Sequence, residues 1–237
     1  MPAPERTPPD ALPLLRDGDL TVHGRMPWSS NGTFFATVAH EGDAMDAVYK
    51  PVRGERALWD FPPGLFRREV AAFELSEALG WGLVPETVAR DGPFGFGSAQ
   101  RFAPSDFSQH YFTLLELPER HRELQAICAL DLLMNNADRK SGHCLLGEDG
   151  RIRAIDHGLC FHADPKLRTV IWDFGGSPIP EELVSDVARL AGSLPASMAA
   201  LLSEEELSAL RQRAEALLRS PRFPHPRSSR AYPWPLV

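Results

Sequence analysis

The alternation of apolar and polar residues divides the chain into a strand-rich first part and a helix-rich second part. Residues 19–26, 32–40 and 46–51 are short runs rich in Val, Phe and Thr between turn residues, which predicts a small antiparallel sheet. Residues 65–80 contain good helix formers and end on a glycine, which predicts a helix with a glycine C-cap. Residues 83–104 return to strand and turn chemistry. The first hundred residues therefore predict a sheet and one helix.

The second part shows helical spacing on both sides of a hairpin. Apolar residues recur at helical intervals in residues 118–136. The segments "HCLL" (143–146) and "RIRAID" (151–156) read as two strands joined by the turn "GEDG". Amphipathic helices are expected at 180–192 and 203–219, the second beginning with a Ser-x-x-Glu capping box. A sheet-rich lobe followed by a helical lobe predicts an α+β fold.

These elements suggest four regions along the chain. Residues 1–13 contain five prolines and are expected to be a flexible leader. The first lobe and a hinge are expected in residues 14–103 and the second lobe in 104–219. The tail, 220–237, is rich in proline and basic residues, and could be either a flexible end or an extended strap on the body of the protein.

Composition narrows the class of protein. The formal charge of −7 on 237 residues gives no general attraction to nucleic acid. Three scattered cysteines, Cys128, Cys144 and Cys160, argue against a disulfide framework and favour a reducing compartment. There is no signal-peptide pattern at the start and no apolar run of about 18 residues. We therefore expect a soluble, cytoplasmic protein without a transmembrane segment.

The segment "NNADRKSGHCLLGEDGRIRAIDHGLCFH" (135–162) carries the most specific chemistry. Asp138 and Asp156 stand at the two ends of the predicted hairpin, which returns the chain to one edge of a cleft. Phosphoryl transfer needs one carboxylate to orient the attacking hydroxyl and another to hold metal on the phosphates. Lys140 could reach the transferred phosphate, and His143 stands where a D-x-x-x-x-N pattern places a metal ligand. These parts predict a kinase-like phosphotransferase.

The first lobe offers matching groups for ATP. Lys50 ends a predicted strand, and Glu69 in the following helix can pair with it and hold it in place. A turn before the second strand can offer backbone N–H groups and hydroxyls to phosphate oxygens, and its residues are Ser29, Ser30, Asn31 and Gly32. Taken singly, each of these residues is more simply a surface or turn residue. Their order along the chain favours a nucleotide site.

The same pieces resemble the phosphatidylinositol 3-/4-kinase superfamily. The similar motifs are "SSNG", "YKP", "GLVPETV", "GSAQRF", "NADRKSGH" and "AIDHGLCF", which run from about Ser29 to Phe161. They are most similar to type II phosphatidylinositol 4-kinases and to a bacterial family described as phosphatidylinositol 3/4-kinase-like. The resemblance implies a bilobal protein-kinase-like fold, ATP with Mg²⁺ or Mn²⁺, and γ-phosphate transfer to a hydroxyl of a lipid headgroup, protein or small molecule.

By residue, the resemblance implies Lys50 on the ATP phosphates with Glu69 as its partner, Asp138 as catalytic acid/base and Asp156 on the metal. It also implies that Gln100, Arg101 and Phe102 lie around the adenine, at a hinge expected at residues 100–103. The cysteine cluster of palmitoylated type II lipid kinases is missing from this chain, so stable membrane residence is not expected.

Two histidines depart from the family pattern. His143 replaces the usual metal-ligating Asn, and His157 follows the metal aspartate where an aromatic residue or Asn is common. Imidazole suits later transition metals better than Mg²⁺. We therefore expect either a preference for Mn²⁺ or an outer-shell role for His143 with Asn135 or Asn136 nearby.

Two further hypotheses compete with an active kinase. A pseudokinase or nucleotide-binding scaffold would keep the fold without turnover, and His143 and the unusual phosphate turn support it. A structural zinc site would draw its ligands from His143, Cys144, His157, Cys160 and His162. Against zinc, the two cysteines more simply fill the core beneath the hairpin.

Remaining charged residues carry weaker expectations. Lys166 and Arg168 either contact an acidic substrate or are ordinary surface charges. Glu116, Asp131 and Glu148 are expected to do no more than interact with solvent or cap a nearby element.

Overall fold

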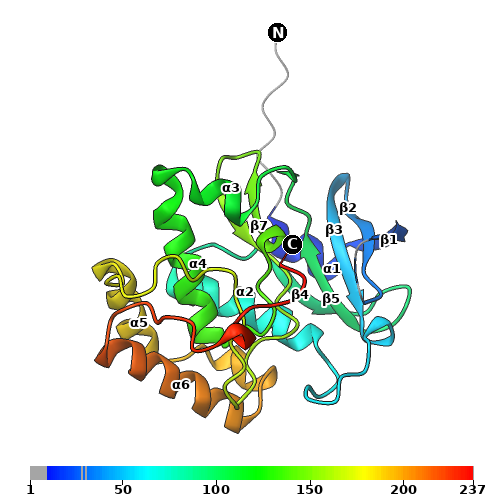
Figure 1. Ribbon diagram of the computed structural model, residues 1–237. Helices are drawn as coiled ribbons and strands as arrows, with labels where there is room; N and C mark the ends of the chain where they lie inside the picture. Colours follow the sequence, from blue (N-terminus) through cyan, green and yellow to red (C-terminus); the bar gives the residue numbers. More distant parts are fainter. Residues whose placement is uncertain (1–9, 28, 30, 237) are drawn as a thin grey trace.

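The computed structural model describes residues 10–27, 29 and 31–236, which form two lobes (Figure 1). The first lobe is a five-stranded antiparallel sheet in the order β1-β2-β3-β5-β4, accompanied by two helices. Its elements are α1 (Ala11–Asp17), β1 (Asp19–Arg25), β2 (Phe34–His40), β3 (Asp43–Pro51), α2 (Phe66–Leu79), β4 (Thr87–Arg90) and β5 (Gly97–Arg101).

The second lobe is mainly helical and includes a short three-stranded sheet in the order β6-β7-β8. Its elements are β6 (Ser105–Asp106), α3 (Tyr111–Leu115), α4 (His121–Met134), β7 (Cys144–Gly147), β8 (Ile152–Ala154), α5 (Glu181–Gly192) and α6 (Glu204–Arg219). The predicted bilobal α+β architecture is confirmed. The capping box predicted for the last helix is also present, with Ser203 and Glu206 bonded reciprocally.

Helix α1 covers one face of the first sheet. Leu14 and Leu15 pack in a small core with Val38 and Ala99 of the strands. Residues 11–13 are thus the first turn of a helix, and their assignment to a flexible leader was wrong. A helix this short has too few apolar positions to show a period, and burial against the sheet holds it in place. The rest of the predicted leader lies outside the described residues.

Helix α2 belongs to the first lobe in sequence but shares the main core with the second. Ala71 and Leu75 are fully buried in the cluster that α4, α5 and α6 also enter. Arg68 on α2 pairs with Glu206 on α6. The helix ends at Gly80, which has a left-handed φ of 76°, the predicted glycine C-cap. This packing fixes α2, and with it Glu69, against the second lobe.

The predicted hairpin forms with small changes. Strands β7 and β8 pair antiparallel around the turn, and β6 adds a third strand that the sequence did not predict. His143 was expected on the first strand but lies in a 3₁₀ turn, η3 (Ser141–His143), directly before it. This turn directs His143 toward the cleft independently of strand alternation.

The C-terminal tail is an extended strap across the second lobe. Phe223 is buried in the main core. Further along, the Ala231 carbonyl accepts the Thr169 N–H at 3.1 Å, and the Leu236 carbonyl accepts the Ser141 N–H at 2.8 Å. In Figure 1 the red segment accordingly runs from α6 to an end between the lobes. Of the two alternatives for the tail, the structure shows the strap.

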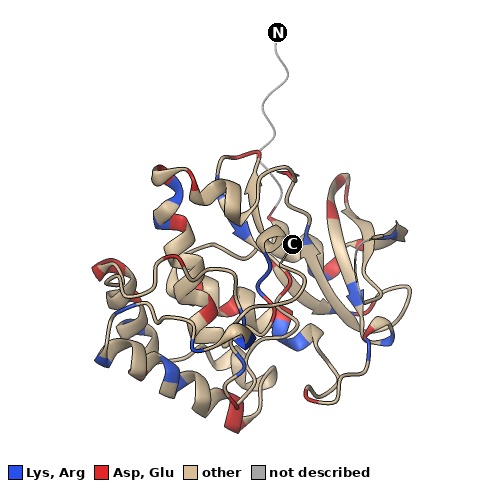
Figure 2. Cartoon of the chain, viewed as in Figure 1, with Lys and Arg blue, Asp and Glu red and all other residues tan. Residues whose placement is uncertain are grey.

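Acidic and basic residues are concentrated at opposite ends of α6. Figure 2 shows red at its start, where Glu204, Glu205 and Glu206 form the first turn, and blue farther along the helix. Among the helices of the described residues, none combines the length and apolar character needed to cross a membrane.

Candidate active site

The two lobes enclose a cleft of about 500 Å³. Most of the residues singled out from the sequence line it: Ser29, Lys50, Gln100, Arg101, Phe102, Asp138, Lys140, His143 and Asp156. The sequence did not point to other lining residues, which include Met26, Thr33, Val48, Phe107 and Pro235. The cleft is large enough for a nucleotide-sized ligand.

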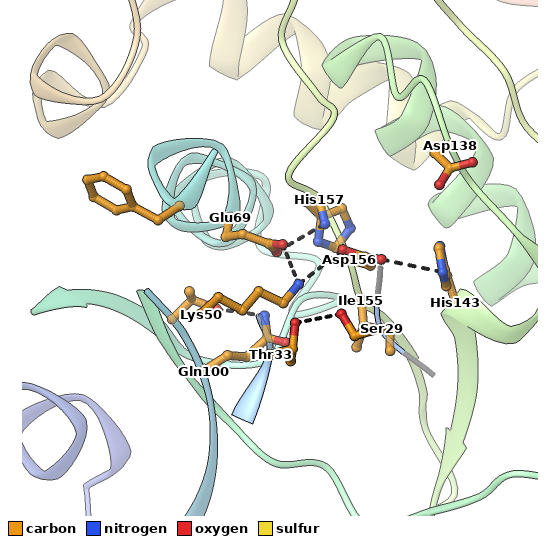
Figure 3. Close-up of polar contacts among 12 residues, drawn as sticks. Ser29, Thr33, Lys50, Glu69, Gln100, Asp138, His143, Ile155, Asp156 and His157 are labelled. Atoms are coloured by element: carbon orange, nitrogen blue, oxygen red, sulfur yellow. Dashed lines mark hydrogen bonds and ion pairs between the residues drawn. The ribbon is translucent and has the colours of Figure 1, made fainter. Parts of the chain in front are cut away.

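Lys50 lies at the centre of the charged groups, near the end of β3 (Figure 3). Its Nζ donates to Glu69 Oε1 at 2.5 Å and to Asp156 Oδ1 at 3.0 Å. Burial alone would lower the pKa of Lys50, but the charges of Asp156 and Glu69 outweigh burial and raise it above its ordinary value. The lysine is therefore a fixed cation that joins the two lobes.

Asp156 is held in a strained backbone conformation. Its φ is +61°, a left-handed value that a non-glycine residue adopts at a cost of roughly 1–3 kcal/mol. The Lys50 charge is the main reason that the pKa of Asp156 lies far below its usual value, although the surrounding protein partly desolvates this half-exposed carboxylate. Next in the chain, the His157 N–H donates to Glu69 Oε2 at 3.0 Å. The carboxylate therefore stays ionised and aimed at the cleft.

Arg139 anchors this strained loop from inside the second lobe. The side chain is fully buried, and its five N–H donors all find acceptors. Nε and one Nη donate to the Asp131 carboxylate at 3.0 Å. The other Nη donates to the carbonyls of Ile155, at 2.8 Å, and His143, at 3.3 Å. The guanidinium thus fixes the residue before Asp156 and the backbone of His143.

The last Arg139 donor determines the tautomer of His157. Arg139 Nη2 lies 2.8 Å from His157 Nε2, and a guanidinium can only donate. His157 Nε2 must therefore accept, and the proton of the neutral ring lies on Nδ1. Burial, reinforced by the Arg139 charge, keeps the pKa of His157 well below its ordinary value. His157 is thus a structural acceptor in this arrangement.

Asp138 faces the cleft from the loop after α4. Its backbone N–H donates to Asn136 Oδ1 at 2.9 Å, and its carboxylate lies 3.3 Å from Lys140 Nζ. Burial raises the pKa of Asp138 above its usual value, and Lys140 partly opposes this. Figure 3 shows Asp138 set apart from the Lys50 contacts, as a group that meets the far side of a ligand would be. A carboxylate of raised pKa suits proton transfer.

His143 lies beside Asp156 at the cleft. The two side chains are 3.6 Å apart, and burial lowers the pKa of His143 to about 4, so the ring is neutral at pH 7. A neutral imidazole beside an ionised carboxylate is a donor set that fits a divalent cation. Asn135 and Asn136 were expected as alternative neighbours, but their amides are bonded to local loops and to Asp131. Both amides are therefore used in contacts within the chain, and the outer-shell role stays a prediction.

The turn that contains Ser29, Asn31 and Gly32 is held by contacts with residues 54–56. Gly32 N–H donates to the Gly54 carbonyl at 2.7 Å, and Asn31 Oδ1 accepts the Arg56 N–H at 2.9 Å. A Cβ on Gly32 would lie 2.7 Å from the Gly54 Cα, so both positions need glycine. Ser29 Oγ lies 2.7 Å from Thr33 Oγ1 at the edge of the cleft.

The turn therefore presents hydroxyls to the cleft, while the N–H of Gly32, expected to be available to phosphate, is already bonded. Ser30 lies outside the described residues.

The side chains of the predicted hinge residues make different contacts within the first lobe. The Gln100 side chain donates to Thr87 at 2.8 Å, and Arg101 pairs with Glu86 at 2.7 Å. Phe102 packs edge-on against a ring of β2. These side chains are engaged with the first lobe, so a base at the hinge would meet their apolar surfaces and backbone.

The zinc hypothesis receives no geometric support from the described residues. Cys144 and Cys160 are free and buried in the main apolar core. Within the part of the chain that the structure describes, no three His, Cys, Asp or Glu side chains gather as metal ligands.

Two charged residues differ from their sequence-based expectations. Asp131 was expected to do no more than contact solvent or cap a helix, and this was wrong: its side chain is fully buried against Arg139. The apolar residues around it on α4 were a signal that it faces the core. Lys166 is paired with Asp60 at 3.0 Å, so it is committed to a contact within the chain.

Comparison with known proteins identifies the family. A sequence model described as phosphatidylinositol 3- and 4-kinase matches residues 83–222, more than half of the chain. The chain belongs to this family. Protein Rv2133c of Mycobacterium tuberculosis is 40% identical over 264 residues, covering 95% of each chain. The kinase prediction is confirmed at the level of family, whereas the similarity to type II phosphatidylinositol 4-kinases remains a prediction.

Solved kinases share the fold of this family member. The Helicobacter pylori proinflammatory kinase CtkA is 12% identical with a TM-score of 0.53, covering 88% of this chain and 94% of that one. A Golgi casein kinase with Mn/ADP bound is 15% identical with a TM-score of 0.57, covering 88% and 74%. The predicted kinase-like fold is confirmed.

Proposed function

We propose that the protein is an ATP-dependent phosphotransferase that moves the γ-phosphate to a hydroxyl. The observation that carries this proposal is Lys50, held between Glu69 and Asp156 where the lobes meet. A lysine fixed by a helix carboxylate and next to a metal-type aspartate is the arrangement that aligns ATP phosphates. The hinge, Gln100 to Ala103, borders the same cleft and would hold the adenine.

Each group has a distinct task in this proposal. Lys50 and Lys140 offset the phosphate charge, and the Ser29 hydroxyl binds a phosphate oxygen. Asp156 and His143 would hold Mg²⁺ or Mn²⁺, which when bound neutralises the phosphates as charge develops. Asp138 orients the acceptor hydroxyl and accepts its proton late in the transfer. The raised pKa of Asp138 favours this last role.

Metal use is supported from two sides. The Golgi casein kinase that shares this fold was solved with Mn/ADP bound. In this chain, His143 supplies a neutral nitrogen beside Asp156, which favours Mn²⁺ over Mg²⁺. We expect faster turnover with Mn²⁺ than with Mg²⁺ when the two metals are compared. In the variant His143→Asn, the difference between the two rates should be smaller. Equal rates with both metals in the unmodified protein would refute the preference.

Turnover separates this proposal from a pseudokinase. Purified protein with γ-labelled ATP should transfer or hydrolyse the label, and Asp138→Asn and Asp156→Ala should lower the rate at least a hundredfold. Glu148→Gln, on an exposed turn, is the matched control. ATP binding without any turnover would favour the pseudokinase, and turnover that survives in Asp156→Ala would overturn the site assignment.

A further inference from the structure

A second, smaller cavity of about 150 Å³ adjoins the nucleotide cleft. The two cavities share three lining residues, Lys50, Asp138 and Asp156. This inference rests on the proposed function, in which Lys50 offsets the phosphate charge, Asp156 would hold the metal and Asp138 orients the acceptor hydroxyl. The cavities therefore meet at the point of phosphoryl transfer and extend from it in different directions.

The geometry of transfer assigns a role to the smaller cavity. Attacking and leaving oxygens must lie roughly in line on opposite sides of the transferred phosphorus. The larger cavity carries the hinge and so takes the nucleotide. The attacking hydroxyl must then approach from the other side of the shared residues. We propose that the smaller cavity is the acceptor site and that it takes a small anionic alcohol.

The walls of this cavity restrict the size of the acceptor. One wall is the loop of residues 55–66, which Glu55 closes by accepting the N–H groups of Gly64 and Phe66. The loop is tied to the second lobe by the Lys166–Asp60 ion pair. A volume of about 150 Å³ is well below the ~300–1,000 Å³ typical of drug-sized ligands. A compact molecule therefore fits better than a folded protein surface.

The residues that line the cavity also indicate which kind of acceptor molecule it would bind. Leu58, Leu65, Phe66 and Leu159 contribute apolar surface to the cavity. Both carboxylate oxygens of Glu55 and of Glu69 are already bonded within the chain. Arg56 is exposed at the same cavity and, among the described residues, forms no side-chain ion pair. An acceptor with its hydroxyl at Asp138 and its anionic group at Arg56 complements this arrangement.

The reaction balances without further reactants. The acceptor oxygen forms a bond to the γ-phosphorus, and the bond between that phosphorus and the bridging oxygen of ATP breaks. The bond's electron pair leaves with ADP, and the hydroxyl proton goes to Asp138. The products are ADP and a phosphate ester of the anionic alcohol.

Matched acceptors test the anion requirement. The purified full chain with γ-labelled ATP and divalent metal is offered glycerol, glycerate and glycerol 3-phosphate, beside a Ser/Thr peptide mixture and phosphatidylinositol vesicles. We expect label on glycerate or glycerol 3-phosphate and at least about tenfold less on glycerol, as the loss of one charge-assisted hydrogen bond predicts. Label only on peptide or vesicles, or on no anionic compound while ATP is hydrolysed, would overturn the inference.

Variants of Arg56 locate the site. Arg56→Ala should raise the KM for the anionic acceptor about tenfold and leave the KM for ATP within about twofold, and Arg56→Lys should restore part of the loss. Arg211→Ala, an exposed arginine on α6, is the control. Equal acceptor KM values in Arg56→Ala and the control would refute the site. If the protein neither binds nor turns over ATP, the proposed function fails instead.

Discussion

The buried Arg139–Asp131 pair permits a quantitative test of how the loops that carry Asp138 and Asp156 are held. Both side chains are 0% exposed, and the shortest contacts between guanidinium and carboxylate are 3.0 Å. Arg139→Met removes the cation and leaves the Asp131 charge buried, which costs about 3–5 kcal/mol of unfolding free energy. At about 2–4 °C per kcal/mol for a domain of this size, Tm should fall by about 6–20 °C.

A double-mutant cycle distinguishes this pair from general damage to the core. Asp131→Leu alone should cost a similar amount, because it leaves the guanidinium charge buried. The double variant Arg139→Met/Asp131→Leu has no buried charge, so its cost should fall short of the sum by at least about 2 kcal/mol. Urea unfolding followed by tryptophan fluorescence measures all four proteins.

The reasoning would be refuted if the unfolding free energies lost in the two single variants summed, within about 0.5 kcal/mol, to the loss in the double variant. A loss below about 1 kcal/mol in either single variant would refute it as well.

Arg139→Lys provides a separate check on how the guanidinium positions the loops. Lysine keeps the charge but has only three N–H donors, so it cannot hold the Asp131 carboxylate and the Ile155 carbonyl as the planar guanidinium does. We expect kcat to fall more than the affinity for ATP changes in this variant.

Two other predictions follow from single contacts. Gly32→Ala should raise the KM for ATP several-fold, because its Cβ would meet the Gly54 backbone; Gly24→Ala, with open space around it, should behave as the unmodified protein in the same assay. Lys140→Ala removes a cation that lowers the pKa of Asp138, so that pKa should rise further. As the pH is lowered, the reaction rate should therefore begin to fall at a higher pH than in the unmodified protein. A pH–rate profile whose acid limb stayed in place or moved downward would contradict the second prediction.

Local patterns in the amino-acid sequence predict most of the helices and strands and the charged residues around the cleft. Strand alternation, the capping box and the glycine C-cap are local signals, so the first sheet, α2 and α6 could be predicted from short windows. Lys50 and Asp156 could be selected because phosphoryl transfer demands few residue types in a fixed order. The alternation of apolar and polar residues then placed Lys50 at the end of a strand and Asp156 at the end of a hairpin.

Other features depend on contacts between residues far apart in the sequence. Asp131 looked like a capping acid, and only the packing of α4 shows that it is buried against Arg139. The tail became a strap because Leu236 and Ala231 found backbone partners more than 60 residues earlier in the chain. The second cavity exists because a loop far from Asp138 in sequence closes over it. Such contacts depend on long-range packing and the pairing of buried polar groups, which no local period reports.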